Sequence, residues 1–158
     1  PGTYKMSNYE KLKKQLPENA SLIIGDVKET VPEFIKEKSE FLKKSPIAYV
    51  SVDLDLYSST KDALKILSEV EPDMCIPSVQ MYFDDADLIV TVSQYTGEGL
   101  AINEFNNENE LRKIEKKILK YSRYYSCHIL DHPVRNGSQK PVIPFELTYT
   151  DFWNIPKF

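Results

Sequence analysis

The fold of this chain is decided by residues 46–64, which read PIAYVSVDLDLYSSTKDAL. Up to Val52 this stretch is apolar and rich in β-branched residues, as in a strand that is buried in a sheet. The strand ends at Asp53, and a helix begins near Ser58, because apolar residues recur from there at helical spacing until Pro72. A buried strand that passes directly into a helix is the repeating unit of α/β folds.

Apolar runs on either side of this unit predict two more strands. The first covers residues 21–24, and the second covers residues 79–83. Residues 27–44, which join the first run to the central strand, carry apolar side chains at helical intervals. Strands joined by helices of this length pair in parallel through right-handed crossovers. We therefore expect an α/β, Rossmann-like fold with a mostly parallel sheet and flanking helices.

The C-terminal part of the chain has a different pattern. Apolar residues at helical spacing predict that a helix begins over residues 100–105 and that the chain continues helical over residues 108–121, with Leu111, Ile114 and Ile118 pointing inward. Residues 121–130 and 142–149 are strand-like and are separated by turn residues, which predicts a closing antiparallel strand pair. The length suits one core of ordinary size, so we expect residues 1–158 to form a single domain.

Composition and charge exclude several classes of protein. Hydrophobic residues at 41% and charged residues at 28% are typical of a globular chain that can bury a core. The net charge of -4 provides no broad positive field, so we do not expect nucleic acid as a partner. The chain has no apolar run of membrane-spanning length and no signal pattern at its start, which predicts a cytoplasmic protein without a membrane partner.

Acidic residues follow the predicted strands at the points where they end. Asp26 follows the first strand, Asp53 and Asp55 follow the second, and Asp84 and Asp85 follow the third. The carboxyl ends of parallel strands meet at one edge of a sheet, where ligands bind. Converging carboxylates repel each other, and a hard divalent cation such as Mg²⁺ relieves this repulsion. An N-cap explains any one of these aspartates, but capping does not require an acidic residue after every strand.

Around these aspartates the chain resembles a known family. The string DLDLYSST at residues 53–60, followed by YFDD at residues 82–85, is similar to the macrocin O-methyltransferase family of class I S-adenosylmethionine-dependent enzymes. Residues 25–32 and 97–105 resemble the segments that precede and follow these motifs in the family, so the likeness spans residues 21–107. The resemblance implies the C-terminal part of a class I methyltransferase fold.

The resemblance also implies a function, an S-adenosylmethionine-dependent, Mg²⁺-assisted O-methyltransferase that acts on a sugar or another hydroxylated small molecule. Mapped from the family, the Mg²⁺ ligands are Asp53, Asp84 and Asp85. The metal would lower the pKa of the acceptor hydroxyl and orient its oxygen toward the methyl group. Asp53 would also act in catalysis by accepting the proton. Gly25 and Asp26 would bind the S-adenosylmethionine cofactor near its adenine.

The chain departs from this family at the start. Its five glycines form no glycine-rich loop of the kind with which the family holds the methionine part of the cofactor. The acidic residue that the family places on the ribose is absent as well. On this basis two βα units are missing at the front, and we expect either the C-terminal portion of a longer protein or a truncated homologue.

Two other functions stay open on the sequence. A chain without half of the cofactor pocket would be a non-catalytic, degenerate methyltransferase-like module, whose exposed sheet edge favours a homo-oligomer. A haloacid-dehalogenase-like, Mg²⁺-dependent phosphatase also uses an Asp-x-Asp after a strand and a later acidic pair, with Asp53 as the nucleophile. That class has a small residue and then Thr or Val where this chain has Leu56 and Tyr57.

Overall fold

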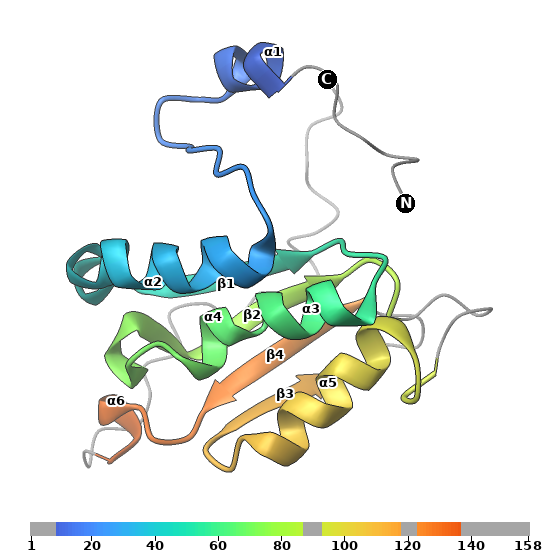
Figure 1. The fold of residues 1–158 in the computed structure, drawn as a ribbon. Coiled ribbons are helices and arrows are strands. Elements are labelled where there is room, and N and C mark those ends of the chain that lie inside the picture. The colour runs from blue at the N-terminus through green and yellow to red at the C-terminus, as the bar shows by residue number, and fades with distance from the viewer. Residues whose placement is uncertain (1–8, 87–92, 118–122, 137–158) are drawn as a thin grey trace, which may run out of the picture.

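The computed structural model describes residues 9–86, 93–117 and 123–136, which form an α/β domain around one four-stranded mixed sheet (Figure 1). The strands are β1 (Ile47–Val52), β2 (Cys75–Phe83), β3 (Arg112–Lys116) and β4 (Tyr124–Ile129). They lie in the order β1-β2-β4-β3. β1 and β2 are parallel, whereas β4 runs antiparallel to both of its neighbours.

The helices of the domain pack on one face of this sheet (Figure 1). They are α2 (Val27–Lys44), α3 (Tyr57–Ala63), α4 (Lys65–Ser68) and α5 (Gly97–Glu108). A 3₁₀ turn, η1 (Pro72–Met74), precedes β2, and a short helix, α6 (Pro133–Asn136), follows β4. The predicted helix over residues 27–44 is confirmed, and the helix predicted to begin near Ser58 is present as α3 and α4.

The hydrophobic core lies between the helices and the covered face of the sheet. The sheet contributes Val52, Val79, Met81, Phe83, Ile114, Cys127 and Ile129, and the helices contribute Leu42, Leu67, Ile102 and Phe105. The opposite face of the sheet is polar and aromatic, and Tyr49 and Tyr124 remain 55% and 49% exposed on it. Burial of one face explains why apolar and polar residues alternate along β2.

The prediction of an α/β domain is confirmed, but the sheet is mixed instead of mostly parallel. Residues 21–24, the predicted first strand, form no regular secondary structure and lie outside the sheet, and Ile23 and Ile24 are 55% and 60% exposed. A strand needs a neighbour for its backbone groups, and no strand of the described chain lies beside this segment. In Figure 1 this segment and the short helix α1 (Tyr9–Gln15) lie apart from the sheet.

The helix predicted over residues 108–121 is also wrong, because residues 112–116 form β3. Ile114 pairs with Cys127 and is buried, whereas the neighbouring apolar residue Leu111 is 50% exposed. At the outer edge of β3, the Asn106 side chain forms hydrogen bonds with both main-chain polar groups of Ile114. It donates to Ile114 O at 2.8 Å and accepts from Ile114 N at 2.7 Å. Of the predicted closing pair, residues 124–129 are β4, and residues 142–149 lie outside the described residues.

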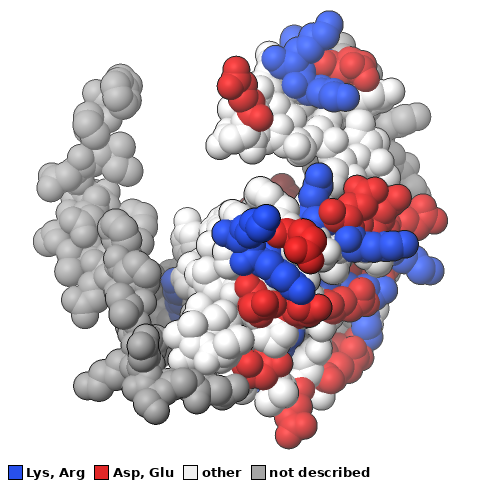
Figure 2. Space-filling model, turned by 90° about the vertical axis from the view of Figure 1, so that its left-hand side faces the viewer, with Lys and Arg blue, Asp and Glu red and all other residues white. Residues whose placement is uncertain are grey.

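Charges of both signs are interleaved at the end of the domain where β1 and β2 begin, which faces the viewer in Figure 2. Lys43 and Glu71 form an ion pair of 2.8 Å there, and Lys65 pairs with Asp62 at 2.6 Å. Both pairs remain accessible to water, which screens them, so they contribute little to stability. None of the helices within the described ranges is long and apolar enough to cross a membrane.

Candidate functional site at the ends of β1 and β2

The parallel pairing of β1 and β2 brings their terminal aspartates to one edge of the sheet. Val52 pairs with Phe83, so Asp53 and Asp84 leave the two strands side by side. The main chain of Asp84 continues the ladder, because its N–H donates to Val52 O at 3.1 Å. Asp55 and Asp85 follow in the adjoining turns. We call these four residues the acidic edge.

A buried threonine fixes the turn between β1 and α3. The Thr60 side chain is 0% exposed, and its hydroxyl lies 3.3 Å from Leu54 O and 3.1 Å from Leu56 O. Leu56 is extended and is the last residue before α3. The chain therefore turns after Asp53, as the sequence predicted, and leaves Asp53 and Asp55 exposed.

The four carboxylates are close enough to influence one another. The pKa of Asp85 is raised, first by partial burial and then by repulsion from Asp84, Asp55 and Asp53. Arg123 opposes this effect by attraction. Asp85 therefore lies within electrostatic reach of the other three carboxylates of the acidic edge.

Arg123 provides one such positive charge from within the chain. Its Nη1 lies 2.5 Å from Asp84 Oδ1 and 3.0 Å from the hydroxyl oxygen of Tyr82. The Tyr82 hydroxyl donates to the same Asp84 oxygen at 2.7 Å. One oxygen of Asp84 is thus occupied by groups of the protein itself.

A fifth carboxylate, which sequence reasoning missed, lies beneath the acidic edge. Glu98, in the first turn of α5, is only 2% exposed, and its Oε2 accepts a hydrogen bond from Asp85 N at 2.9 Å. Among the described residues, its buried Oε1 has no hydrogen-bond partner. Burial raises the pKa of Glu98 to about 7, although attraction from the N–H groups of Asp85, Leu54 and Ala86 opposes the rise.

Two glycines flank Glu98 at the start of α5. Gly97 has a left-handed φ of 52°, and a Cβ at Gly99 would collide with the carbonyl group of Ser93. The sequence alone gave no sign that Glu98 is buried, because an acidic residue in the first turn of a helix is usually an exposed partner of the helix dipole.

The donor chemistry of the acidic edge suits Mg²⁺, which prefers carboxylate oxygens. Asp53, Asp84 and Asp85 supply such oxygens from adjacent strand ends. In the described parts of the chain, however, no three His, Cys, Asp or Glu side chains are placed so that they could hold a metal ion. Mg²⁺ ligation by these three residues therefore stays a prediction.

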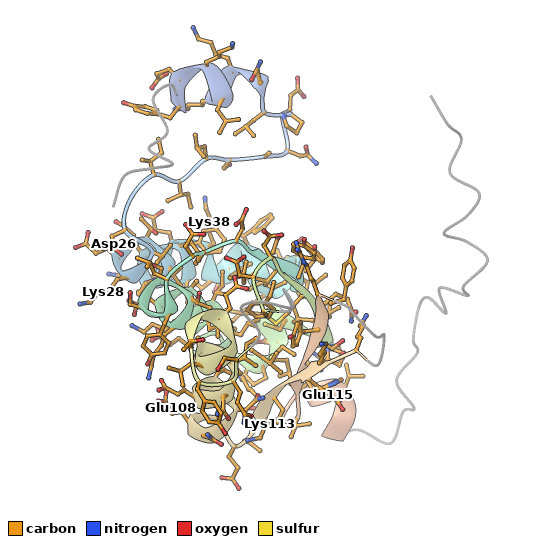
Figure 3. The ribbon with its side chains drawn as sticks, turned by 90° about the vertical axis from the view of Figure 1, so that its right-hand side faces the viewer. Asp26, Lys28, Lys38, Glu108, Lys113 and Glu115 are labelled. Atoms are coloured by element: carbon orange, nitrogen blue, oxygen red, sulfur yellow. The ribbon has the colours of Figure 1, made fainter. Side chains whose placement is uncertain are left out.

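Gly25 and Asp26 have local roles in starting α2. Asp26 is the N-cap of this helix, and its side chain accepts from Lys28 N at 3.0 Å. A Cβ at Gly25 would come within 2.6 Å of the Thr30 side chain. In Figure 3 Asp26 lies on the helix side of the domain and Glu115 on the sheet side. Binding of S-adenosylmethionine by Gly25 and Asp26 stays a prediction.

Neither a protein-family model, nor a curated protein, nor a solved structure matches this chain. The resemblance of residues 53–60 and 82–85 to the macrocin O-methyltransferases is accordingly a hypothesis from the sequence. The case for a function rests on that hypothesis together with the geometry of the acidic edge.

Proposed function

We propose that this chain provides the metal-binding and acceptor-binding part of a Mg²⁺-assisted, S-adenosylmethionine-dependent O-methyltransferase. One observation carries the proposal: two hydrogen-bonded parallel strands end in Asp53 and in Asp84-Asp85 at the same edge. In open α/β sheets this edge is where ligands bind. The methyltransferase-like strings at residues 53–60 and 82–85 contribute these same aspartates.

Each aspartate has a part in this proposal. Asp53, Asp84 and Asp85 would hold Mg²⁺, which when bound would acidify and orient an acceptor hydroxyl. Asp53 is exposed, so its carboxylate can also accept the hydroxyl proton from an acceptor that approaches from solvent. Asp84 would exchange its contact with Arg123 for the cation. Gly25 and Asp26 would contact the adenine part of the cofactor.

The arrangement of the sheet is compatible with the finer fold that we propose, the C-terminal part of a Rossmann-like class I methyltransferase. The sequence predicted a mostly parallel sheet with a closing antiparallel strand pair, and in the described sheet the parallel pair β1 and β2 is followed by the antiparallel strands β4 and β3. The polar face is partly exposed and no described strand covers the outer edge of β1, so both have room for further elements.

A non-catalytic, degenerate module is the second candidate, and one specific observation favours it. Arg123 neutralises Asp84 through a contact of 2.5 Å, so the acidic edge is partly balanced without a metal. If this ion pair is permanent, the edge is a structural remnant and not a cation site. The two candidates therefore differ in whether Mg²⁺ displaces Arg123.

Calorimetric titration separates these candidates. Mg²⁺ is titrated into the full chain and into the Asp53→Asn variant, with Asp73→Asn as a matched control, because Asp73 is an exposed aspartate in η1 at the other end of β2. We expect saturable heat from the unaltered chain and the control, and loss of this heat in Asp53→Asn. S-adenosylmethionine is then titrated with Mg²⁺ present. If Mg²⁺ binding releases or absorbs no heat, the metal site is refuted and the non-catalytic module is the remaining candidate. If Mg²⁺ binds but S-adenosylmethionine does not, only methyl transfer by this chain is excluded.

A further inference from the structure

A serine, a histidine and a glutamate from three adjacent strands contact one another in series on the polar face of the sheet. Ser78 Oγ lies 3.3 Å from His128 Nδ1, and His128 Nε2 lies 3.3 Å from Glu115 Oε2. Ser78 in β2 pairs directly with His128 in β4, so the ladder brings their side chains together. Glu115 in β3 pairs with Ser126, two residues before His128, and reaches the imidazole along the diagonal.

The two contacts of His128 determine which ring nitrogen carries the proton. The Glu115 carboxylate can only accept a hydrogen bond, so in the neutral imidazole Nε2 is the donor. Nδ1 then has a lone pair, which faces the Ser78 hydroxyl. A serine hydroxyl on the lone pair of an imidazole, whose other nitrogen is held by a carboxylate, is the arrangement that makes serine a nucleophile in proteins.

A side-chain amide with a fixed orientation lies on the same face as Ser78. Gln80 Nε2 donates to Ser78 O at 3.1 Å, and Lys117 Nζ donates to Gln80 Oε1. Because the ammonium group can only donate, it directs the NH₂ group of the amide toward Ser78. The second N–H of this group is therefore a candidate donor for the negative charge that develops when Ser78 attacks a carbonyl group.

The site is accessible to solvent and lies away from the acidic edge. The His128 side chain is 29% exposed, and the helices of the core pack on the other face of the sheet. Glu115 lies on the sheet side of the domain in Figure 3. Ser78 belongs to the first half of β2, whereas the acidic edge follows its last residue. The site is therefore independent of the proposed Mg²⁺ site.

We propose that Ser78, His128 and Glu115 form an acyl-transfer site that hydrolyses small carboxylic esters. Ser78 Oγ bonds to the ester carbonyl carbon while its proton passes to His128 Nδ1, and the alcohol leaves with that proton. Water then attacks the acyl-serine, and His128 takes a proton from the water and returns it to Ser78 as the acid is released. Glu115 is a positioning residue, because it contacts only the imidazole, and Gln80 donates to the carbonyl oxygen.

Four variants separate these roles. Ser78→Ala removes the nucleophile, His128→Gln removes the base, and Glu115→Ala removes the group that fixes the imidazole tautomer. Ser126→Ala is the matched control, because Ser126 is a serine on the same face of β4, two residues before His128. Circular dichroism establishes the folded fraction of each variant.

The first test is hydrolysis of 4-nitrophenyl acetate by the full chain, with an alkyl fluorophosphonate as a trap and mass spectrometry to locate the modified residue. We expect the trap to modify Ser78, Ser78→Ala to be inactive, His128→Gln to hydrolyse the ester about 100-fold more slowly, and Ser126→Ala to keep the full rate. No modification of Ser78 in the unaltered chain, or an unchanged rate in folded Ser78→Ala or His128→Gln, would overturn the inference.

The second test needs no catalytic variant. Long-range nitrogen-proton NMR of the unaltered chain should show the single imidazole proton of neutral His128 on Nε2, and Glu115→Ala should shift the population toward the other tautomer. A proton on Nδ1 in the unaltered chain would overturn the inference, because the nitrogen that faces Ser78 could then not accept its proton. An unchanged tautomer in Glu115→Ala would remove Glu115 from the site.

Discussion

Replacing Glu98 with Gln is expected to remove part of the pH dependence of the free energy of unfolding. Burial raises the pKa of Glu98 from its ordinary value of 4.5 to about 7 in the folded chain. Between these pH values the folded state holds a proton that the unfolded state has released, so stability falls as pH rises and stays lower above pH 7. At about 1.4 kcal/mol for each tenfold change in proton affinity, the loss is roughly 3 kcal/mol.

Urea unfolding followed by circular dichroism measures this difference at pH 5 and pH 8 without divalent cations. The unaltered chain should lose about 2–3 kcal/mol more stability between the two pH values than Glu98→Gln does. The pKa of Asp85 is raised as well, but Asp85 is present in both proteins, so its contribution largely cancels in the comparison. Equal losses in the two proteins would refute the assignment of Glu98 as a buried acid that is protonated below neutral pH.

Three further outcomes are expected. Arg123→Gln should raise the Mg²⁺ association constant severalfold in calorimetry, because the Arg123 guanidinium pairs with Asp84 Oδ1 and competes with a cation for it. Weaker Mg²⁺ binding by this variant would contradict the competition. Thr60→Val should lower the free energy of unfolding by about 1 kcal/mol in urea titration, because the single proton of the buried Thr60 hydroxyl is shared between Leu54 O and Leu56 O; an unchanged value would mean that this hydrogen bonding contributes nothing. Burial raises the pKa of Cys75 to about 11 and that of Cys127 to about 12, so neither thiol should react with a disulfide reagent at pH 8 until urea unfolds the chain; fast native reaction would disprove their burial.

Local patterns in the sequence predicted the central part of the fold. Helix α2 covers residues 27–44 as expected, and β1 ends at Val52 so that Asp53 begins the turn. Parallel pairing of β1 with β2 then brought Asp53 beside Asp84. The helix and the strand follow from the local spacing of apolar residues, and in this part of the chain the tertiary contacts favour the same structures.

The failed predictions depend on contacts that a single segment does not encode. Residues 21–24 are apolar but have no neighbouring strand, so burial did not follow from their composition. Around Ile114 the apolar spacing fits both a helix and a strand, and pairing with β4 decided for the strand. Glu98 is buried because α5 packs against the strand ends, which no local pattern around this residue reveals.

The most direct test of a cation site at the acidic edge is the amide nitrogen-proton NMR spectrum during a Mg²⁺ titration. We expect saturable shifts of the amide signals of Asp53, Leu54, Asp85 and Ala86, because these groups lie in the turns that carry the aspartates. Sodium chloride at matched ionic strength serves as the control and should leave the same signals in place. Shifts scattered over the whole surface, or no Mg²⁺-specific shift in these turns, would contradict a divalent-cation site formed by Asp53, Asp84 and Asp85.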